Sequence, residues 1–427
     1  MNQLKDGYVV DVPYPTFVHR QAMPLWMSVL IQQQGFDTPE IEKPFRYLEL
    51  GCAMGIHLHL TAAAHPQGQF VGVDFNPQQL MVAQEGIETT GIANIEFIQA
   101  SFDELLDLDL GGFDFIVTHG VWSWVTDQQQ QHMTEIVNRL LNPGGIFYCS
   151  YMSHPGATHF SSIQKLMLEM SRNLQGNSAE KAVQCLHLAR TLAQHPVGLF
   201  QKVPSLKQDL AALAQDKPEY VAHDFLSQHW QPQHSADMIR RFGQIQLAYT
   251  AGAGIIENID RISLPASVQK VIATLPFVPL QETAKDIARN SMQRQDLYVK
   301  QRSKLKNSAY LSRIEFGLLP RAPVGQSLRD DAKIGIIEDV IPIFEQILLA
   351  LSQHPMSIAA LAKHLTVQLN VKQLSEIVMV LVWAGYVHPR TQTSDVIMTE
   401  KMNQWMKQQN LNWRVIPEYA TAIEMLI

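Results

Sequence analysis

The chain has 427 residues, of which 46% are hydrophobic and 17% are charged. This composition excludes wholesale disorder and leaves room for two or three domains. Its net charge of −7 argues against a nucleic-acid partner, because such binding depends on Lys and Arg neutralising phosphates. Three cysteines cannot build a disulfide framework or a CxxC zinc site, the N-terminus lacks a signal-peptide pattern, and no apolar run approaches the ~20 residues that span a bilayer. We therefore expect a cytoplasmic protein without membrane insertion.

Residues 45–151 alternate short apolar runs with helical patterns, which is typical of a parallel sheet flanked by helices. Asn76 and Pro77 mark a helix start, since Asn is a preferred N-cap and Pro suits the first turn. Asn142-Pro-Gly-Gly145 is a turn signal that ends the preceding helix. The predicted strands are 45–50, 70–73, 94–98, 113–118 and 146–150, and the predicted helices are 57–64, 77–87 and 130–141.

Beyond this α/β region the patterns become mainly helical. Residues 158–310 carry long helical patterns broken by prolines, and strand signals are sparse there. From about residue 335 three short helices are predicted, followed by two short strands, an order that indicates a winged-helix-like module. The predicted boundaries are 1–157 for the α/β domain, 158–334 for the helical domain and 335–427 for the C-terminal module. The helices of that module are predicted at 340–352, 358–365 and 371–385, and its strands at 386–387 and 396–398.

The loop after the first predicted strand indicates a ligand site. Gly51 permits a tight turn, and Gly55 lets a ligand approach the free N–H groups that open the next helix. Asp74 ends the second strand, where an acidic residue of a doubly wound sheet can accept both ribose hydroxyls. Taken singly, the glycines are compatible with ordinary turns, and Asp74 with a helix cap.

The ligand that these residues favour is S-adenosylmethionine rather than a dinucleotide. A dinucleotide site prefers G-x-G-x-x-G, whereas the spacing here is Gly51-x-x-x-Gly55. Glu49 at the strand tip would repel phosphates but suits an ammonium and a sulfonium; its alternative role is pairing with a nearby base. Ser101 and Phe102 follow the third strand, where an adenine would meet a polar edge and an apolar wall, although Phe102 is equally suited to a core.

The segment after the fourth strand is expected to face the transferred methyl group, because this edge of an open α/β sheet faces the ligand. His119 is a candidate general base or orienting group there, with a purely structural histidine as the alternative. Trp122 and Trp124 are candidates for an aromatic wall that stabilises a cation, with core packing as the alternative. Tyr151, just past the fifth strand, is a further candidate for the same catalytic pocket.

With these residues in view, the chain resembles the class I methyltransferases that carry a methyltransferase regulatory domain, a group that includes rickettsial outer-membrane protein lysine methyltransferases. The resemblance covers about residues 7–310 and departs from the usual pattern at Cys52, Met54 and Lys300. It implies a Rossmann-like sheet and an opening segment folded over the cofactor, which makes Tyr14 a candidate contact, and it places Phe75 in a cofactor motif. The motifs that carry it are Gly7–Tyr14, Glu49–Gly51, Val73–Pro77, His119–Val125, Ser150–Tyr151, Tyr220–Leu226 and Asp296–Lys300.

Three hypotheses about function remain open at this stage. The first is an S-adenosylmethionine-dependent methyltransferase for protein lysine amino groups, the acceptor that the resemblance implies. The second is a methyltransferase for a small metabolite, with the middle helices as a lid. The third is a regulatory protein that retains the cofactor fold without turnover. We expect no metal site, because acidic ligands do not cluster in the sequence, and for the C-terminal module we consider substrate recruitment or formation of a homodimer.

Overall fold

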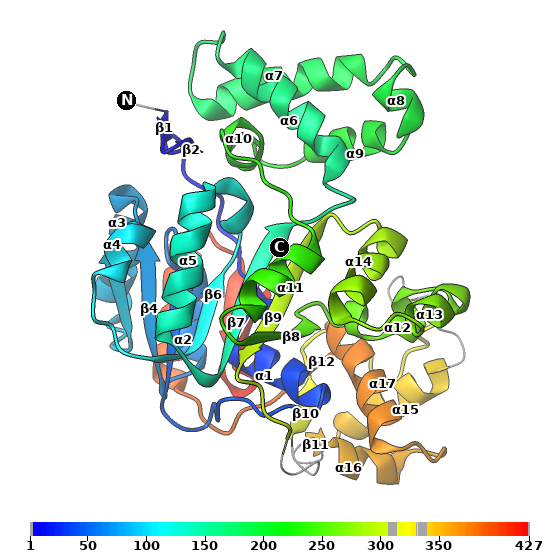
Figure 1. The fold of residues 1–427 in the computed structure, drawn as a ribbon. Coiled ribbons are helices and arrows are strands. Elements are labelled where there is room, and N and C mark those ends of the chain that lie inside the picture. The colour runs from blue at the N-terminus through cyan, green and yellow to red at the C-terminus, as the bar shows by residue number, and fades with distance from the viewer. Residues whose placement is uncertain (1–2, 306–313, 330, 332–339, 426–427) are drawn as a thin grey trace.

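A seven-stranded sheet forms the centre of the protein in a computed structural model that describes residues 3–305, 314–329, 331 and 340–425 (Figure 1). The strand order is β5-β4-β3-β6-β7-β9-β8, and the first five of these run parallel. Strand β9 is antiparallel to both of its neighbours. The strands are β3 Phe45–Leu50, β4 Gly68–Asp74, β5 Ile95–Gln99, β6 Phe113–Thr118, β7 Leu141–Met152, β8 Leu247–Gly252 and β9 Gln293–Lys300. The protein is thus a Rossmann-like α/β protein, as the sequence predicts.

The first five strands confirm the sequence prediction closely. Strand β3 and strand β6 have the predicted bounds, and Asn76 caps helix α3 by accepting a hydrogen bond from the Gln78 N–H. The Asn142–Gly145 turn signal lies within the bounds of β7, at the point where its register with β6 shifts. The turn residues therefore produce an irregularity in the strand rather than a separate loop.

Two strands of the sheet lie in the stretch that the sequence analysis assigned to a helical domain. Strands β8 and β9 join the sheet beside β7, so the sheet extends beyond the boundary expected at residue 157. The reason for the difference is visible in β9, where Arg294 and Asp296 are buried although both are charged. Buried charges hide a strand from a reading based on apolar runs.

Helices cover both faces of the sheet. Alternate residues of β3 point to opposite faces, so Phe45 and Tyr47 join one core while Leu48 and Leu50 join the other. Helices α5 and α11 contribute to the second core, and helices α1 and α2 to the first. The helices that flank the sheet are α1 Pro24–Gln33, α2 Ile56–Ala64, α3 Pro77–Thr90, α4 Phe102–Leu106, α5 Asp127–Leu140, α11 Ser235–Gly243, α12 Asp260–Ser263, α13 Ala266–Ile272 and α14 Val278–Arg289.

A separate helical layer lies beyond one end of the strands, at the top of Figure 1. It is inserted between β7 and α11 and has its own apolar core. Val9 and Val12 of the N-terminal segment, which carries the short strands β1 Leu4–Lys5 and β2 Tyr8–Val9, are buried in that core. Its helices are α6 Thr158–Ser171, α7 Ser178–Leu192, α8 Leu199–Lys202, α9 Leu206–Leu213 and α10 Pro218–Leu226.

The C-terminal module contains the three predicted helices, as α15 Ile341–Leu351, α16 Ile358–Leu361 with the 3-10 turn Ala362–His364, and α17 Val371–Ala384. The predicted strand at 396–398 is wrong: these residues open helix α18 Val396–Gln408, where the Asp395 side chain accepts a hydrogen bond from the Met398 N–H. The predicted strand at 386–387 corresponds to β12 Val387–Pro389, which pairs with β10 Glu315–Leu318 in a sheet completed by β11 Met356–Ser357. Strands β13 Trp413–Ile416 and β14 Thr421–Glu424, which were not predicted, pair as an antiparallel hairpin. The expected boundary at residues 334–335 lies outside the described residues.

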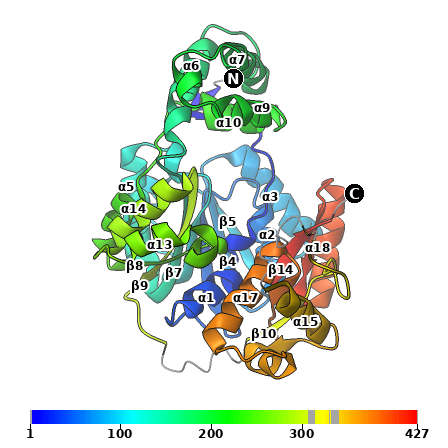
Figure 2. The same ribbon diagram turned by 90° about the vertical axis from the view of Figure 1, so that its right-hand side faces the viewer.

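The C-terminal module packs directly against the helices that follow strands β3 and β4, as Figure 2 shows for α18 and α2. Trp405 of α18 is 1% exposed, and its ring lies 4.7 Å from that of His59 on α2. Gly86 of α3 leaves room for this contact, because a Cβ there would lie 2.6 Å from the Trp405 ring. The module therefore supports the helix that begins at the glycine loop.

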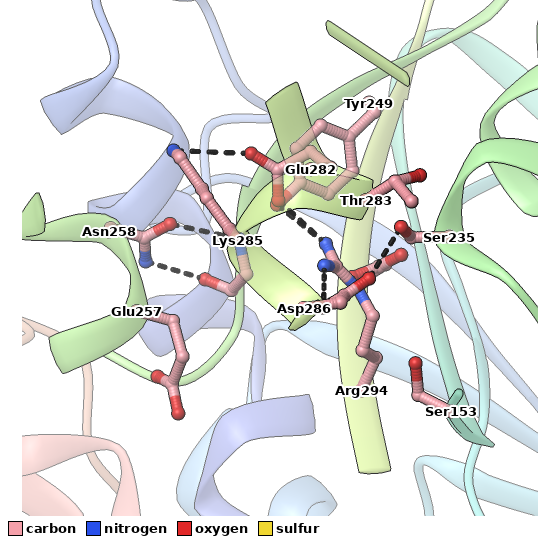
Figure 3. A network of polar contacts seen from close by, with 12 residues as sticks. Ser153, Ser235, Tyr249, Glu257, Asn258, Glu282, Thr283, Lys285, Asp286 and Arg294 are labelled. Atoms are coloured by element: carbon pink, nitrogen blue, oxygen red, sulfur yellow. Dashed lines mark hydrogen bonds and ion pairs between the residues drawn. The ribbon is translucent and has the colours of Figure 1, made fainter. Parts of the chain in front are cut away.

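A buried ionic network joins β9 to the neighbouring helix α14 (Figure 3). The Arg294 guanidinium lies 2.9 Å from Glu282, 2.7 Å from Asp286 and 2.9 Å from Asp296. The Tyr151 hydroxyl donates to the Asp296 carboxylate at 2.6 Å. These contacts satisfy charges that would otherwise be costly to bury. Among the described residues, no helix is long and apolar enough to cross a membrane.

Candidate active site

A cavity of about 360 Å³ lies at the carboxyl ends of β3, β4, β5 and β6. Parallel strands of an open α/β sheet present their ligand site at this edge. The N-terminal segment covers the cavity through Tyr8, Tyr14 and Phe17. Ten of the residues expected from the sequence line it: Tyr14, Glu49, Gly51, Gly55, Asp74, Phe75, Ser101, Phe102, His119 and Trp124.

The two glycines of the loop are required by conformation and by packing. Gly51 has φ +78°, and a Cβ there would lie 2.5 Å from the side chain of Val121. Gly55 has φ +67° and precedes helix α2, and its Cβ would lie 2.5 Å from the Phe97 ring. A side chain at Gly55 is therefore excluded by strand β5, whereas the sequence interpretation attributed the exclusion to the ligand. Both glycines hold the loop in the left-handed conformation that residues other than glycine rarely adopt.

Asp74 ends β4 and shapes the loop opposite it. Its carboxylate accepts hydrogen bonds from the Ala53 N–H at 2.9 Å and the Asn76 N–H at 2.8 Å, one on each oxygen. A carboxylate oxygen can accept two hydrogen bonds, so both oxygens of Asp74 can still accept one from a ligand hydroxyl. Burial raises the pKa of Asp74, and the backbone N–H groups act in the opposite direction. The carboxylate is thus oriented before any ligand arrives.

Glu49, at the end of β3, is a buried acid with an unused acceptor atom. It is 6% exposed, and its Oε2 atom has no hydrogen-bond partner. Burial raises its pKa to about 8, and the neighbouring Asp74 adds to this rise. An unpartnered buried carboxyl is costly, so the site is better suited to a ligand that brings a cation to it.

Ser101 and Phe102 begin helix α4 at the edge of the cavity next to Phe75. The Ser101 hydroxyl and N–H both donate to the Glu104 carboxylate at 2.8 Å, which fixes the start of the helix. Phe75 lies under the Lys5 ammonium, 4.8 Å from its ring centre, and 6.5 Å from the Tyr8 ring. This end of the cavity therefore has the flat apolar walls that an adenine requires.

His119 stands at the end of β6 with a fixed ring. Its Nδ1 atom lies 2.7 Å from the Tyr148 hydroxyl, and its ring stacks on His19 at 3.4 Å. Burial lowers the pKa of His119 well below its usual value, and His19 and His57 act in the same direction. The imidazole is therefore neutral at physiological pH. The structure favours a role in orienting the acceptor over a role as general base.

Trp124 lies on the cavity wall, but its neighbour Trp122 does not. The 3-10 turn Trp122–Trp124 directs the two rings to different sides, and Trp122 is fully buried 5.3 Å from the Phe242 ring. Tyr151 is also fully buried, with its hydroxyl on Asp296. Neither Trp122 nor Tyr151 lines the cavity, so the expectation that they contact the reacting groups is corrected. Trp122 packs against α11 instead, and Tyr151 is hydrogen-bonded to β9.

Several lining residues escaped the sequence reading. His19 and His57 line the cavity beside His119, and isolated histidines gave no signal of this grouping. Tyr8, which also lines the cavity, could have been predicted from the sequence because it belongs to the Gly7–Tyr14 motif. In the described part of the chain, no group of His, Cys, Asp and Glu side chains is arranged to hold a metal ion.

Comparisons with known proteins identify the family of this chain. Residues 41–250 match the family described as a methyltransferase domain, and residues 217–300 match a predicted methyltransferase regulatory domain. An uncharacterised protein of Rickettsia prowazekii is 30% identical over 226 residues, which cover 51% of this chain and 86% of that protein. The chain belongs to the methyltransferases that carry a regulatory domain. An uncharacterised protein of Synechocystis is 27% identical over 90% of this chain and 76% of its own length.

The fold of this methyltransferase is also that of a solved structure, PKMT2 from Rickettsia typhi. The TM-score is 0.71 at 19% identity, and the match covers 97% of this chain and 86% of that one. A second structure of PKMT2 contains AdoHcy. At this identity the similarity shows the fold alone.

The cofactor of this methyltransferase is S-adenosylmethionine, and the residues present fit it. Asp74 has free acceptor capacity for ribose hydroxyls, and the unpartnered Glu49 oxygen suits the ammonium group. The Phe75 and Phe102 side chains suit the adenine ring. S-adenosylmethionine supplies a methyl group on a sulfonium, so the protein needs mainly to align the acceptor and exclude water.

Proposed function

We propose that this methyltransferase transfers the methyl group to protein lysine amino groups. The observation that carries the proposal is the wall of uncharged rings beside β6, formed by Tyr14, His119 and Trp124. An amine attacks a methyl group only in its neutral form, and apolar surroundings favour that form by lowering the pKa of the ammonium. The resemblance of the sequence to the rickettsial protein lysine methyltransferases supports the same acceptor, and the fold shared with PKMT2 of Rickettsia typhi is consistent with it.

In the proposed mechanism the residues of the chain bind the cofactor, orient the acceptor and exclude water. Glu49 would hold the ammonium group of the cofactor and Asp74 its ribose hydroxyls, and the aromatic wall would confine the acceptor chain. His119 is held by Tyr148 and His19, so its neutral ring positions the acceptor without adding positive charge near the sulfonium. The N-terminal segment covers the cavity and keeps water from the reacting atoms.

A small-molecule acceptor is the second candidate, because the cavity lies beneath the N-terminal segment rather than on an open surface. Both candidates are separated by one experiment: incubation of the purified protein with methyl-labelled S-adenosylmethionine and a cell extract, fractionated by size. We expect label on protein, at lysines identified by mass spectrometry, and much less label with Asp74→Ala at a limiting cofactor concentration. Label confined to the low-molecular-mass fraction would refute the lysine proposal and support the second candidate.

We further propose a division of the chain that follows the sheet. Residues 158–226 form a covering domain inserted into the methyltransferase domain, whose sheet continues through β8 and β9. The C-terminal module supports α2, and we assign it no separate partner. For the location of the protein we propose the cytoplasm.

A further inference from the structure

Helix α10 places a second buried acid, Asp224, beside three residues that line the cavity, Tyr8, Tyr14 and Trp124. Figure 1 shows α10 beside the N-terminal segment at the covered end of the sheet. Asp224 is 8% exposed, and its backbone oxygen accepts a hydrogen bond from Trp124 Nε1 at 3.2 Å. Burial raises the pKa of Tyr8 and of Tyr14, and the charge of Asp224 raises both further. These two tyrosines line the cavity. The acid therefore lies within electrostatic reach of the cavity from the covering side.

The aromatic side chains around Asp224 come from three parts of the chain. Tyr14 and Phe17 belong to the N-terminal segment, Trp124 follows β6, and Tyr220 lies one helical turn before Asp224 on α10. The ring centres of Phe17 and Tyr220 are 5.9 Å apart, and those of Tyr14 and Tyr220 are 6.4 Å apart. Phe17 lines the cavity and is 44% exposed, so this group of rings extends from the cavity to solvent.

Asp224 lacks the cation that a buried carboxylate ordinarily requires. In the part of the chain that the structure describes, no basic side chain is within ion-pairing distance of Asp224. Burial raises its pKa to about 7, while the adjacent Tyr220 hydroxyl acts in the opposite direction and Asp216 raises it further. A buried acid of this kind is often functional, because desolvation brings its proton exchange into the physiological range.

The acid and the rings together match one class of ligand, an alkyl chain that ends in an amine. Aromatic faces attract cations and pack against methylene groups, and a carboxylate pairs with an ammonium. We propose that the acceptor enters between the N-terminal segment and α10, and that Asp224 binds its amine before transfer. This inference rests on the proposed function and names the residues that would select a primary amine.

Asp224 also provides a destination for the proton that the acceptor must lose. The carboxylate takes one proton from the ammonium and becomes a neutral acid. The free electron pair of the amine then forms the N–C bond to the methyl carbon while the C–S bond breaks, and sulfur keeps that bonding pair. The product is a methylammonium and a neutral thioether, so charge and atoms balance.

A binding experiment tests the site without knowledge of the natural acceptor. The probes are two cofactor analogues in which nitrogen replaces sulfur: one carries a 3-aminopropyl arm in place of the methyl group, and the other an uncharged butyl arm. Their dissociation constants are measured by calorimetry for the parent, for Asp224→Asn and for Asp216→Asn. Asp216 is exposed, precedes α10 and raises the pKa of Asp224 through its charge, so its variant controls for loss of a nearby negative charge.

We expect the parent and Asp216→Asn to bind the aminopropyl analogue at least about tenfold more tightly than the butyl analogue. Asp224→Asn should lose this preference while binding S-adenosylhomocysteine as tightly as the parent. A parent without preference, or an Asp224→Asn variant that retains it, would overturn the inference. If the preference depends on Asp224 but no protein lysine is ever methylated, the amine site stands and the lysine proposal fails; methylated lysines without a role for Asp224 give the reverse result.

Discussion

Replacement of Glu49 by glutamine should stabilise the cofactor-free protein while weakening cofactor binding. Burial raises the pKa of Glu49 from 4.5 to about 8. A folded-state pKa above the unfolded value means that stability is fully present below pH 4.5 and is lost as pH rises towards 8. At about 1.4 kcal/mol per unit, the raised pKa of Glu49 lowers the free energy of unfolding by about 2 kcal/mol at pH 6 and about 4 kcal/mol at pH 8. Glutamine resembles the protonated acid in shape and does not titrate, so Glu49→Gln avoids this cost.

The assay is urea unfolding of the cofactor-free protein, followed by tryptophan fluorescence at pH 5, 6 and 8, with Glu85→Gln as an exposed glutamate control on α3. We expect the gain in free energy of unfolding for Glu49→Gln to grow by about 2 kcal/mol between pH 6 and pH 8, and the control to show no trend. Calorimetry should show weaker binding of S-adenosylmethionine by about 1–3 kcal/mol, because the ammonium loses a charged partner. A variant that is less stable than the parent at pH 8, or one that binds the cofactor equally well, would refute the reasoning.

Further predictions concern the ribose carboxylate, the stacked histidine and the buried ionic network. Asp74→Ala should weaken S-adenosylmethionine binding by ~1–3 kcal/mol in calorimetry, through lost charged hydrogen bonds, and unchanged affinity would exclude the ribose assignment. His119→Ala should lower the turnover number by about tenfold with a smaller change in cofactor affinity, since the ring positions the acceptor; equal turnover would make it a structural residue. Arg294→Met should cost ~3–5 kcal/mol of unfolding free energy because it removes the guanidinium that pairs with three buried acids, although Glu282 keeps its ion pair with Lys285. The exposed Arg240→Met is its control, and equal stability of the two variants would contradict the account.

The sequence predicts strands β3 to β7 well because their buried positions are occupied by apolar residues. Strand β3 reads Phe-Arg-Tyr-Leu-Glu-Leu, and its apolar positions face two cores. Strand β9 is not found by the same reasoning. Arg294 pairs with Asp296 on its own strand and with acids on α14 that lie next to it only in the folded chain. The helix at Val396 was predicted as a strand because a short apolar run fits either structure, although Asp395 already offered the cap that decides it.

In the candidate site, too, the sequence predicts some residues and misses others. The cofactor residues follow consecutive parallel strands, so topology alone brings Glu49, Asp74 and His119 to one edge. The direction of a side chain after a strand is a different matter: Trp122 and Trp124 are two residues apart, yet one fills a core and the other the cavity wall. The stack of His19 on His119 depends on tertiary packing, and no spacing in the sequence reports it.

The central claim is that the cavity at the ends of β3 to β6 delivers a methyl group to lysine. The most direct measurement is mass spectrometry of proteins incubated with the purified protein and S-adenosylmethionine whose methyl group carries a heavy isotope. The account predicts heavy methyl groups on lysine side chains, strongly reduced at a limiting cofactor concentration when Asp74→Ala replaces the parent. Heavy methyl groups found only on other acceptors, or incorporated equally by the Asp74→Ala variant, would contradict it.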